Sequence, residues 1–196
     1  MRPFATSILR ATVHDDVFLG HVRHRHRHRH RHRHRHRGWN DRHAHPIEDT
    51  HRALAELCEI AGPVPVVLVG HSMGARAALR AVGNPRVTGV VALAPWCPPG
   101  KPTAHLAGRT LIALHDETDR VTRAVDTWSY LTHARSVGAR VFGLSMPGGG
   151  HAMLRGARRW HRAAAGATIA LLGPASLPAP LSKDSSWTGT PTPWRD

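Results

Sequence analysis

The strongest constraint on the fold is an alternation of short apolar runs with segments of helical periodicity between residues 47 and 172. The apolar runs are rich in Val, Leu and Ala, which is typical of strands buried on both faces of a parallel sheet. Strands are expected at 64–70, 87–94, 109–115 and 139–146, and helices at about 47–61, 73–83, 121–137 and 151–172. Such βαβ crossovers predict an α/β protein, a three-layer αβα sandwich with a mostly parallel sheet.

Length and composition exclude several other classes of protein. The chain has 196 residues, of which 41% are apolar, so it can form one domain with a buried core. Its two cysteines, Cys58 and Cys97, cannot form a disulfide framework, and we expect both to be reduced thiols. No apolar run reaches the roughly 18–20 residues of a membrane-spanning helix, and the amino-terminal residues lack a signal-peptide pattern. These features predict a cytoplasmic protein without a membrane span.

A tract at 23–37 alternates Arg and His and contributes 8 of the 27 Lys+Arg residues behind the formal net charge of +14. In a strand, all Arg would lie on one face and all His on the other, so neither face could enter a core. Three interpretations stay open: a repeat without function, adventitious binding of metal ions by the imidazoles, and electrostatic binding of a polyanion. The tract has no interleaved aromatic residues, so no specific recognition of nucleic acid is predicted. No metal site is predicted elsewhere.

The two ends of the chain differ from its central part. Residues 1–46, which include the tract, are expected to form a degenerate, partly disordered segment with a short strand at 17–19. A helical face is expected near the start, formed by Phe4, Ile8, Leu9 and Val13. Residues 47–173 are expected to be the folded core. The tail at 174–196 is rich in Pro, Ser and Thr and is expected to be disordered.

The motif G-H-S-M-G at 70–74 lies where an expected strand meets an expected helix. In a G-x-S-x-G turn the serine takes a strained backbone conformation, and its glycine neighbours let the strand and the helix pass closely. The turn lifts the Ser72 hydroxyl above the carboxyl edge of the sheet. It also places the N–H of Met73 at a helix N-terminus, where it can stabilise an oxyanion. The pentapeptide also occurs by chance, so the prediction depends on the flanking strand and helix.

A serine nucleophile needs a base and a carboxylate that orients the base, and candidates for both follow Ser72 in the order Ser, acid, His. H-D-E-T-D-R-V-T after the third strand offers Asp116, Glu117 and Asp119, and M-P-G-G-G-H-A-M-L after the fourth offers His151. Taken singly, the acids could belong to a solvated turn and the histidine to a helix N-terminus. Taken together, they supply three residue types in the required order, each at the carboxyl end of its own strand. We therefore predict the catalytic triad Ser72, Asp119 and His151.

Residues from about 39 to 173 resemble the α/β-hydrolase superfamily, specifically its small actinobacterial serine hydrolases. The matching segments are, in order, V-V-L-V-G-H-S-M-G-A-R-A-A-L, V-V-A-L-A-P-W, H-D-E-T-D-R-V-T and P-G-G-G-H-A-M-L. The resemblance implies a catalytic core at 47–173 whose acid is the Asp before Arg-Val-Thr, which is Asp119. It also places Trp96 beside the substrate pocket, although an aromatic plug over the sheet edge is an equally open interpretation. His71, next to the nucleophile, is expected to line the same pocket.

The resemblance also shows a departure from the family pattern before the elbow. Family members carry two or three further strands there, and a loop of the H-G-G or P-G-G-G type that supplies the second oxyanion N–H. No such loop precedes Ser72 in this sequence. Residues 1–22 resemble the helix that ordinarily follows that loop, and the Arg/His tract occupies the place of the next strand. We expect an amino-terminally shortened chain with early strands missing or degenerate, and impaired turnover.

The resulting hypothesis is a serine hydrolase that cleaves an ester, thioester or amide of a small-molecule substrate through an acyl-enzyme, without a cofactor. The alternative is a catalytically weak or inactive hydrolase remnant whose tract binds metal ions or polyanions.

Overall fold

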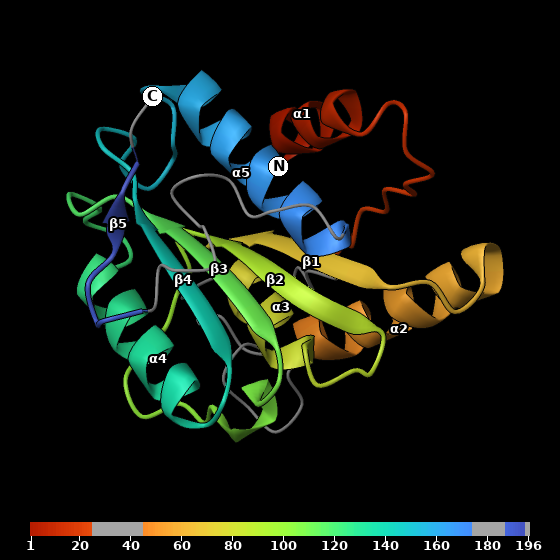
Figure 1. Ribbon diagram of the computed structural model, residues 1–196, viewed down its shortest axis with the longest axis horizontal. Coiled ribbons are helices and arrows are strands. Elements are labelled where there is room, and N and C mark those ends of the chain that lie inside the picture. Colours follow the sequence, from red (N-terminus) through yellow and green to blue (C-terminus); the bar gives the residue numbers. More distant parts are fainter. Residues whose placement is uncertain (25–44, 174–186, 195–196) are drawn as a thin grey trace, which may run out of the picture.

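The computed structural model describes residues 1–24, 45–173 and 187–194, and its centre is a five-stranded parallel sheet (Figure 1). The strands are β1 (Val66–His71), β2 (Val87–Leu93), β3 (Thr110–His115), β4 (Arg140–Ser145) and β5 (Thr192–Pro193). They lie side by side in the order in which they occur in the chain, and every neighbouring pair is parallel. The predicted α/β class with a parallel sheet is confirmed.

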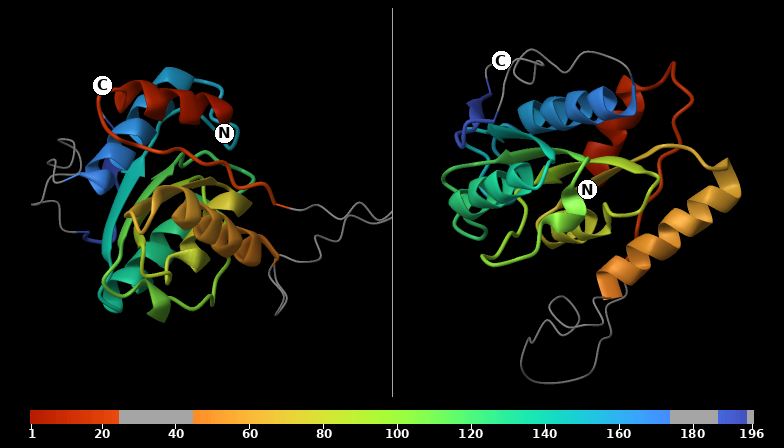
Figure 2. Two further views of the ribbon diagram at one scale, coloured as in Figure 1. Left: turned by 90° about the vertical axis from the view of Figure 1, so that its right-hand side faces the viewer. Right: turned by 60° about the horizontal axis from the view of Figure 1, so that its bottom comes forward.

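Helices cover both faces of this sheet and complete three layers (Figures 1 and 2). Helices α1 (Arg2–Ala11) and α5 (Ala157–Leu172) lie on one face and pack against each other. Helices α2 (His45–Ala61), α3 (Met73–Ala81) and α4 (Ala124–Ser136) lie on the other face. A short 3-10 helix, η1 (Ala104–Leu106), belongs to the connection between β2 and β3. No helix in the described part of the chain is both long and apolar enough to cross a membrane.

The continuous apolar runs arise because consecutive residues of a central strand enter different halves of the core. In β2, Val90 and Ala92 pack on the side of α3 and α4, whereas Val91 and Leu93 pack on the side of α5, near Trp160. Successive side chains of a strand point to opposite faces of the sheet, and here both faces are covered by helices. A strand in this position therefore needs an apolar residue at nearly every place.

Two helices begin later than the sequence predicted. Helix α4 was expected from about 121 and begins at Ala124, and α5 was expected from about 151 and begins at Ala157. In the second case Gly150 and Gly156 have φ angles of 55° and 68°, which are incompatible with a right-handed helix. The residues before both helices therefore form loops at the carboxyl edge of the sheet, where the candidate acid and histidine lie.

The amino-terminal segment forms a helix, but its predicted apolar face is only partly used. Phe4 and Ile8, one turn apart on α1, are buried, whereas Leu9 is 46% exposed because it follows Ile8 directly and points to another side of the helix. Val13 lies beyond the end of α1 and is 70% exposed. The strand expected at 17–19 does not form.

The end of the chain is structured where the sequence predicted disorder. Residues 192–193 form β5, which pairs with the free edge of β4. The side chain of Trp187 is buried over Gly143, which leaves room for the indole ring because it has no Cβ. Trp187 also accepts a hydrogen bond at its carbonyl from Arg135 and donates one through Nε1 to Thr132 Oγ1. A single aromatic residue and a strand of two residues produce no hydrophobic periodicity, so neither could be predicted from the sequence pattern. The rest of the predicted tail, 174–186, lies outside the described residues, as do residues 25–37 of the Arg/His tract.

Candidate active site

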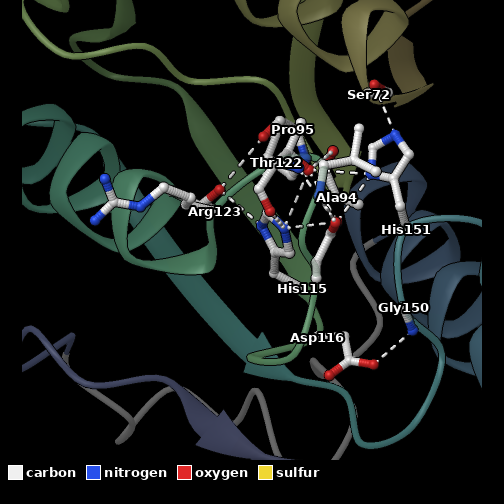
Figure 3. A network of polar contacts seen from close by, with 12 residues as sticks. Ser72, Ala94, Pro95, His115, Asp116, Thr122, Arg123, Gly150 and His151 are labelled. Atoms are coloured by element: carbon white, nitrogen blue, oxygen red, sulfur yellow. Dashed lines mark hydrogen bonds and ion pairs between the residues drawn. The ribbon is translucent and has the colours of Figure 1, made fainter.

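Ser72 stands at the sharp turn from β1 into α3, with φ 53° and ψ −118° (Figure 3). The two glycines of the motif contribute differently. A Cβ on Gly70 would lie 2.6 Å from the N and Cα atoms of Ala75, whereas a Cβ on Gly74 would meet no atom of a neighbouring segment within 4 Å. The expectation that both glycines permit the close passage was therefore wrong for Gly74. Met73 is the first residue of α3, so its N–H belongs to the amino-terminal turn of that helix.

The structure brings the three predicted triad residues into one chain of hydrogen bonds. His151 Nε2 lies 3.0 Å from Ser72 Oγ, and His151 Nδ1 lies 2.8 Å from Asp119 Oδ2 (Figure 3). The carboxylate can only accept, so Nδ1 carries the proton and donates it to Asp119. Nε2 is then the free acceptor, and the Ser72 hydroxyl donates to it. This is the arrangement in which the imidazole can remove the serine proton.

The Asp119 carboxylate is fully buried and held in its charged form by several donors. Burial acts to raise the pKa of Asp119, but hydrogen bonds from His151, from the N–H groups of Val121 and Thr122 and from the Thr122 hydroxyl lower this pKa to about 2. The carboxylate is therefore ionised at neutral pH. A negative charge next to Nδ1 favours the tautomer described above and stabilises the imidazolium that forms when His151 takes a proton.

Asp116, the first of the three candidate acids, holds the loop that carries His151 (Figure 3). Its Oδ2 accepts hydrogen bonds of 2.6 Å from both the Gly149 and the Gly150 N–H, and its Oδ1 accepts from Thr118. Asp116 is only 2% exposed, so the solvated-turn interpretation was wrong for it. The two carboxylates of this loop thus have separate tasks: Asp119 contacts the His151 ring, and Asp116 contacts the backbone just before it.

A comparison with family models gave a match over residues 12–196 to a model described as the alpha/beta hydrolase family. The chain belongs to the alpha/beta hydrolase family. The predicted membership of the α/β-hydrolase superfamily is thereby confirmed. Among solved structures, this hydrolase is similar to the esterase domain of a Rhodothermus marinus protein, with 17% sequence identity, a TM-score of 0.45 and coverage of 74% of this chain and 70% of that chain. A comparison with curated proteins gave no significant match.

Two residues of the site in this alpha/beta hydrolase were missed by the sequence reasoning. His115, the last residue of β3, is fully buried, and its Nε2 lies 3.2 Å from Asp119 Oδ2 and 3.0 Å from the Thr122 carbonyl oxygen. Both neighbours are acceptors, so Nε2 donates, and Nδ1 accepts from the Thr127 hydroxyl at 2.8 Å. Burial lowers the pKa of His115, which keeps it neutral. The Asp119 carboxylate therefore lies between two histidines, His151 on one side and His115 on the other.

Thr122 is the second missed residue. Its hydroxyl lies 2.9 Å from Asp119 Oδ2, 3.1 Å from His151 Nδ1 and 3.2 Å from the Ala94 carbonyl oxygen. One signal for both residues was present in the sequence, because His115 and Thr122 flank the candidate acids in H-D-E-T-D-R-V-T. Nothing in that pattern told which of these side chains faces the carboxylate.

Backbone strain is concentrated at this edge of the sheet. Within the described ranges, three residues other than glycine have a positive φ: Ser72, Ala94 at 41° and Met153 at 55°. Ala94 follows β2 directly and donates to the Leu114 carbonyl at 2.8 Å, and its own carbonyl oxygen lies 3.2 Å from the Thr122 hydroxyl oxygen. Such conformations cost of order 1–3 kcal/mol each and persist only where tertiary contacts impose them.

The two predicted pocket residues make contacts of different kinds. His71 Nε2 donates to the carbonyl oxygen of His151 at 2.9 Å, and the two imidazole rings are 4.8 Å apart. Burial lowers the pKa of His71, so this neutral ring ties the His151 loop to the elbow. Trp96 packs its ring against the Arg76 guanidinium, 4.4 Å from the ring centroid, and the backbone N–H of Trp96 donates to the Ser72 carbonyl. Across residues 1–24, 45–173 and 187–194, no group of three or more His, Cys, Asp or Glu side chains is arranged to hold a metal ion.

Proposed function

We propose that this alpha/beta hydrolase is a serine hydrolase that cleaves an ester, thioester or amide of a small molecule through an acyl-enzyme. The observation that carries the proposal is the continuous path Ser72 Oγ to His151 Nε2 at 3.0 Å and His151 Nδ1 to Asp119 Oδ2 at 2.8 Å. Membership of a hydrolase family supports the same class of reaction.

The reaction that fits this geometry has two matched halves. His151 Nε2 takes the Ser72 proton while Oγ forms a bond to the carbonyl carbon, and the Met73 N–H donates to the oxyanion of the tetrahedral intermediate. The bond to the leaving group then breaks, and the leaving alcohol, thiol or amine takes the proton from His151. A water molecule next gives a proton to His151 while its oxygen forms a bond to the acyl carbon. The bond between the acyl carbon and Ser72 Oγ then breaks, Oγ takes the proton back from His151, and the acid is released. Asp119 stays ionised throughout because of its lowered pKa.

The test is labelling by a fluorophosphonate probe together with hydrolysis of p-nitrophenyl acetate. The wild-type chain should be labelled at Ser72, and Ser72→Ala should abolish labelling and lower kcat by about 10⁶-fold, the loss found when a triad nucleophile is removed. Ser129→Ala is a matched control because Ser129 is an exposed serine on α4. Unchanged hydrolysis by Ser72→Ala would refute the assignment. A folded wild-type chain that is neither labelled nor active would favour the alternative of a non-catalytic remnant.

A further inference from the structure

A second, fully buried histidine contacts the candidate acid from the end of a central strand. His115 is the last residue of β3, and its Nε2 lies 3.2 Å from Asp119 Oδ2. His151 Nδ1 lies 2.8 Å from the same oxygen atom. Figure 3 shows the two imidazole rings in one network of polar contacts. The hydrogen-bonded path that begins at Ser72 therefore continues past the carboxylate and into the sheet.

Each oxygen of the Asp119 carboxylate is held by a different set of donors. Oδ1 accepts from the backbone N–H groups of Val121 and Thr122, which belong to the same loop as the acid. Oδ2, the oxygen that faces His151, accepts from the Thr122 hydroxyl and from His115. Of the contacts that hold Oδ2 in this way, the one from His115 comes from a strand, and that strand pairs with β2 on one side and β4 on the other. His115 therefore ties the oxygen that faces His151 to the centre of the sheet.

The neighbours of His115 decide which of its ring nitrogen atoms carries the proton. Nε2 faces two acceptors, Asp119 Oδ2 and, at 3.0 Å, the Thr122 carbonyl oxygen. Nδ1 lies 2.8 Å from the hydroxyl oxygen of Thr127, which is 1% exposed. A second acceptor, the Pro95 carbonyl oxygen, is 3.5 Å from this hydroxyl, at the limit of a hydrogen bond, so the hydroxyl donates to Nδ1. Thr127 thereby fixes the tautomer that directs an N–H at the acid.

A buried thiol supports this direction of proton donation. The Cys97 thiol makes a side-chain hydrogen bond with Thr127, and burial raises the pKa of this thiol to about 12. The thiol therefore keeps its proton at neutral pH and can donate it to the Thr127 oxygen, which leaves the hydroxyl proton for His115. Burial also lowers the pKa of His115, so its imidazole stays neutral. A neutral donor can hold Asp119 in place without cancelling the negative charge that His151 needs.

We propose that His115 is a positioning residue for the hydrolysis, because it holds Asp119 Oδ2 next to His151 Nδ1. The inference rests on the proposed serine hydrolase function, in which His151 becomes an imidazolium as it takes the Ser72 proton. The attraction between that cation and Asp119 depends on their distance and direction, so a carboxylate that can turn away stabilises the transition state less. The cation forms only as the reaction proceeds, and substrate binding does not depend on it. Loss of the His115 donor should therefore lower kcat and leave KM unchanged.

A pair of substitutions at His115 separates this role from packing. His115→Gln keeps an N–H at the same number of bonds from Cβ as Nε2, whereas His115→Phe keeps a ring edge-on to Trp128, 6.0 Å away, but has no donor. In hydrolysis of p-nitrophenyl acetate, His115→Phe should lower kcat by about 10–100-fold at unchanged KM, and His115→Gln should lower it less. A role in packing alone predicts the opposite order, because the glutamine variant buries an amide in place of the ring. His133→Phe is the matched control, since His133 is exposed on α4.

A second pair of substitutions acts one residue further along the path. Thr127→Ser keeps the hydroxyl that donates to His115 Nδ1, whereas Thr127→Val replaces this hydroxyl by a methyl group. Thr127→Val should lower kcat more than Thr127→Ser at unchanged KM, although serine leaves the larger cavity. All kinetics are measured at a temperature at which circular dichroism shows each variant to be folded, and the Thr127 pair decides the matter where His115→Phe does not fold.

Proton NMR tests the inference without turnover. The proton that His151 Nδ1 donates to a buried carboxylate has a strongly downfield resonance, which should be visible in the wild type and in His115→Gln and be broadened by solvent exchange in His115→Phe. An unchanged resonance in His115→Phe would overturn the proposal, as would equal kcat values for the wild type, His115→Phe and Thr127→Val. A loss confined to KM would also overturn it. A wild-type chain without hydrolytic activity would instead refute the proposed function, and the resonance would still show whether His115 holds Asp119.

Discussion

Replacing Gly70 by alanine should destabilise this protein and impair its site, whereas the same change at Gly74 should do neither. A Cβ at Gly70 would lie 2.6 Å from the backbone N and Cα of Ala75 and from the Gly74 carbonyl carbon. That is roughly 1 Å less than the optimum contact between carbon atoms. Because all three neighbours are backbone atoms, no side chain can move aside, and the start of α3 must shift away from β1.

The expected cost follows from this overlap. Overpacking by one methyl group typically costs about 1–3 kcal/mol, and a backbone clash belongs at the upper end, near 3 kcal/mol. In a chain of this size that corresponds to a fall in Tm of about 6–12 °C. The shift also moves Ser72 and the Met73 N–H, and a displacement of about 1 Å at a catalytic group can cost about 10²-fold in kcat. At Gly74 the added methyl group meets open space, and the better helix propensity of alanine should add less than about 1 kcal/mol.

Thermal and urea unfolding of the wild type, Gly70→Ala and Gly74→Ala would measure these differences, with p-nitrophenyl acetate hydrolysis as the functional readout. The matched pair removes the general effect of a glycine-to-alanine change. If Gly70→Ala unfolds within about 0.5 kcal/mol of the wild type, or if both variants lose the same stability, the reasoning from close passage at the elbow is refuted.

Three further predictions concern the acids and the buried histidine. Asp119→Asn should lower kcat by about 10⁴-fold, because an amide nitrogen facing His151 Nδ1 reverses the tautomer of the imidazole. Asp116→Asn should lower kcat less and should mainly lower the free energy of unfolding. Steady-state kinetics and urea unfolding would show this ranking, and the reverse order would contradict the assignment of Asp119 as the acid. His115→Phe removes the buried donor to Asp119 and should lower stability by about 1–3 kcal/mol, measured as a shift in Tm; an unchanged Tm would mean that this contact adds nothing. Since the pKa of Asp119 is lowered from 3.8 to about 2, its charged form should contribute roughly 2 kcal/mol above pH 4 that is lost as the pH falls toward 2. Urea unfolding between pH 4 and pH 2 should show this loss of unfolding free energy in the wild type and a smaller loss in Asp119→Asn. Equal losses in the two chains would show that the charge of Asp119 does not contribute this stability.

The sheet and the order of the site were readable from the sequence because both depend on local patterns. A central strand covered on both faces must be apolar at nearly every position, so β1 to β4 could be located within a few residues. The carboxyl ends of parallel strands lie at one edge, so Ser72, the acids after β3 and His151 could be expected near one another. By contrast, Trp187 and β5 left no periodic signal, because their contacts depend on the free edge of β4 and on the space above Gly143.

Within the site, the sequence by itself determined which residue types are present and in what order, since these follow from strand, turn and motif. Only the tertiary structure decided how each one is used. Asp116 and Asp119 lie three residues apart in one loop, and both contact the loop that carries His151. Asp116 accepts from the backbone N–H groups of that loop, whereas Asp119 contacts the imidazole ring. Gly70 and Gly74 look alike in the motif, but only Gly70 lies against another segment. The physical reason is the same in both cases: a hydrogen bond or a close contact depends on where distant segments meet, and short-range spacing does not encode that position.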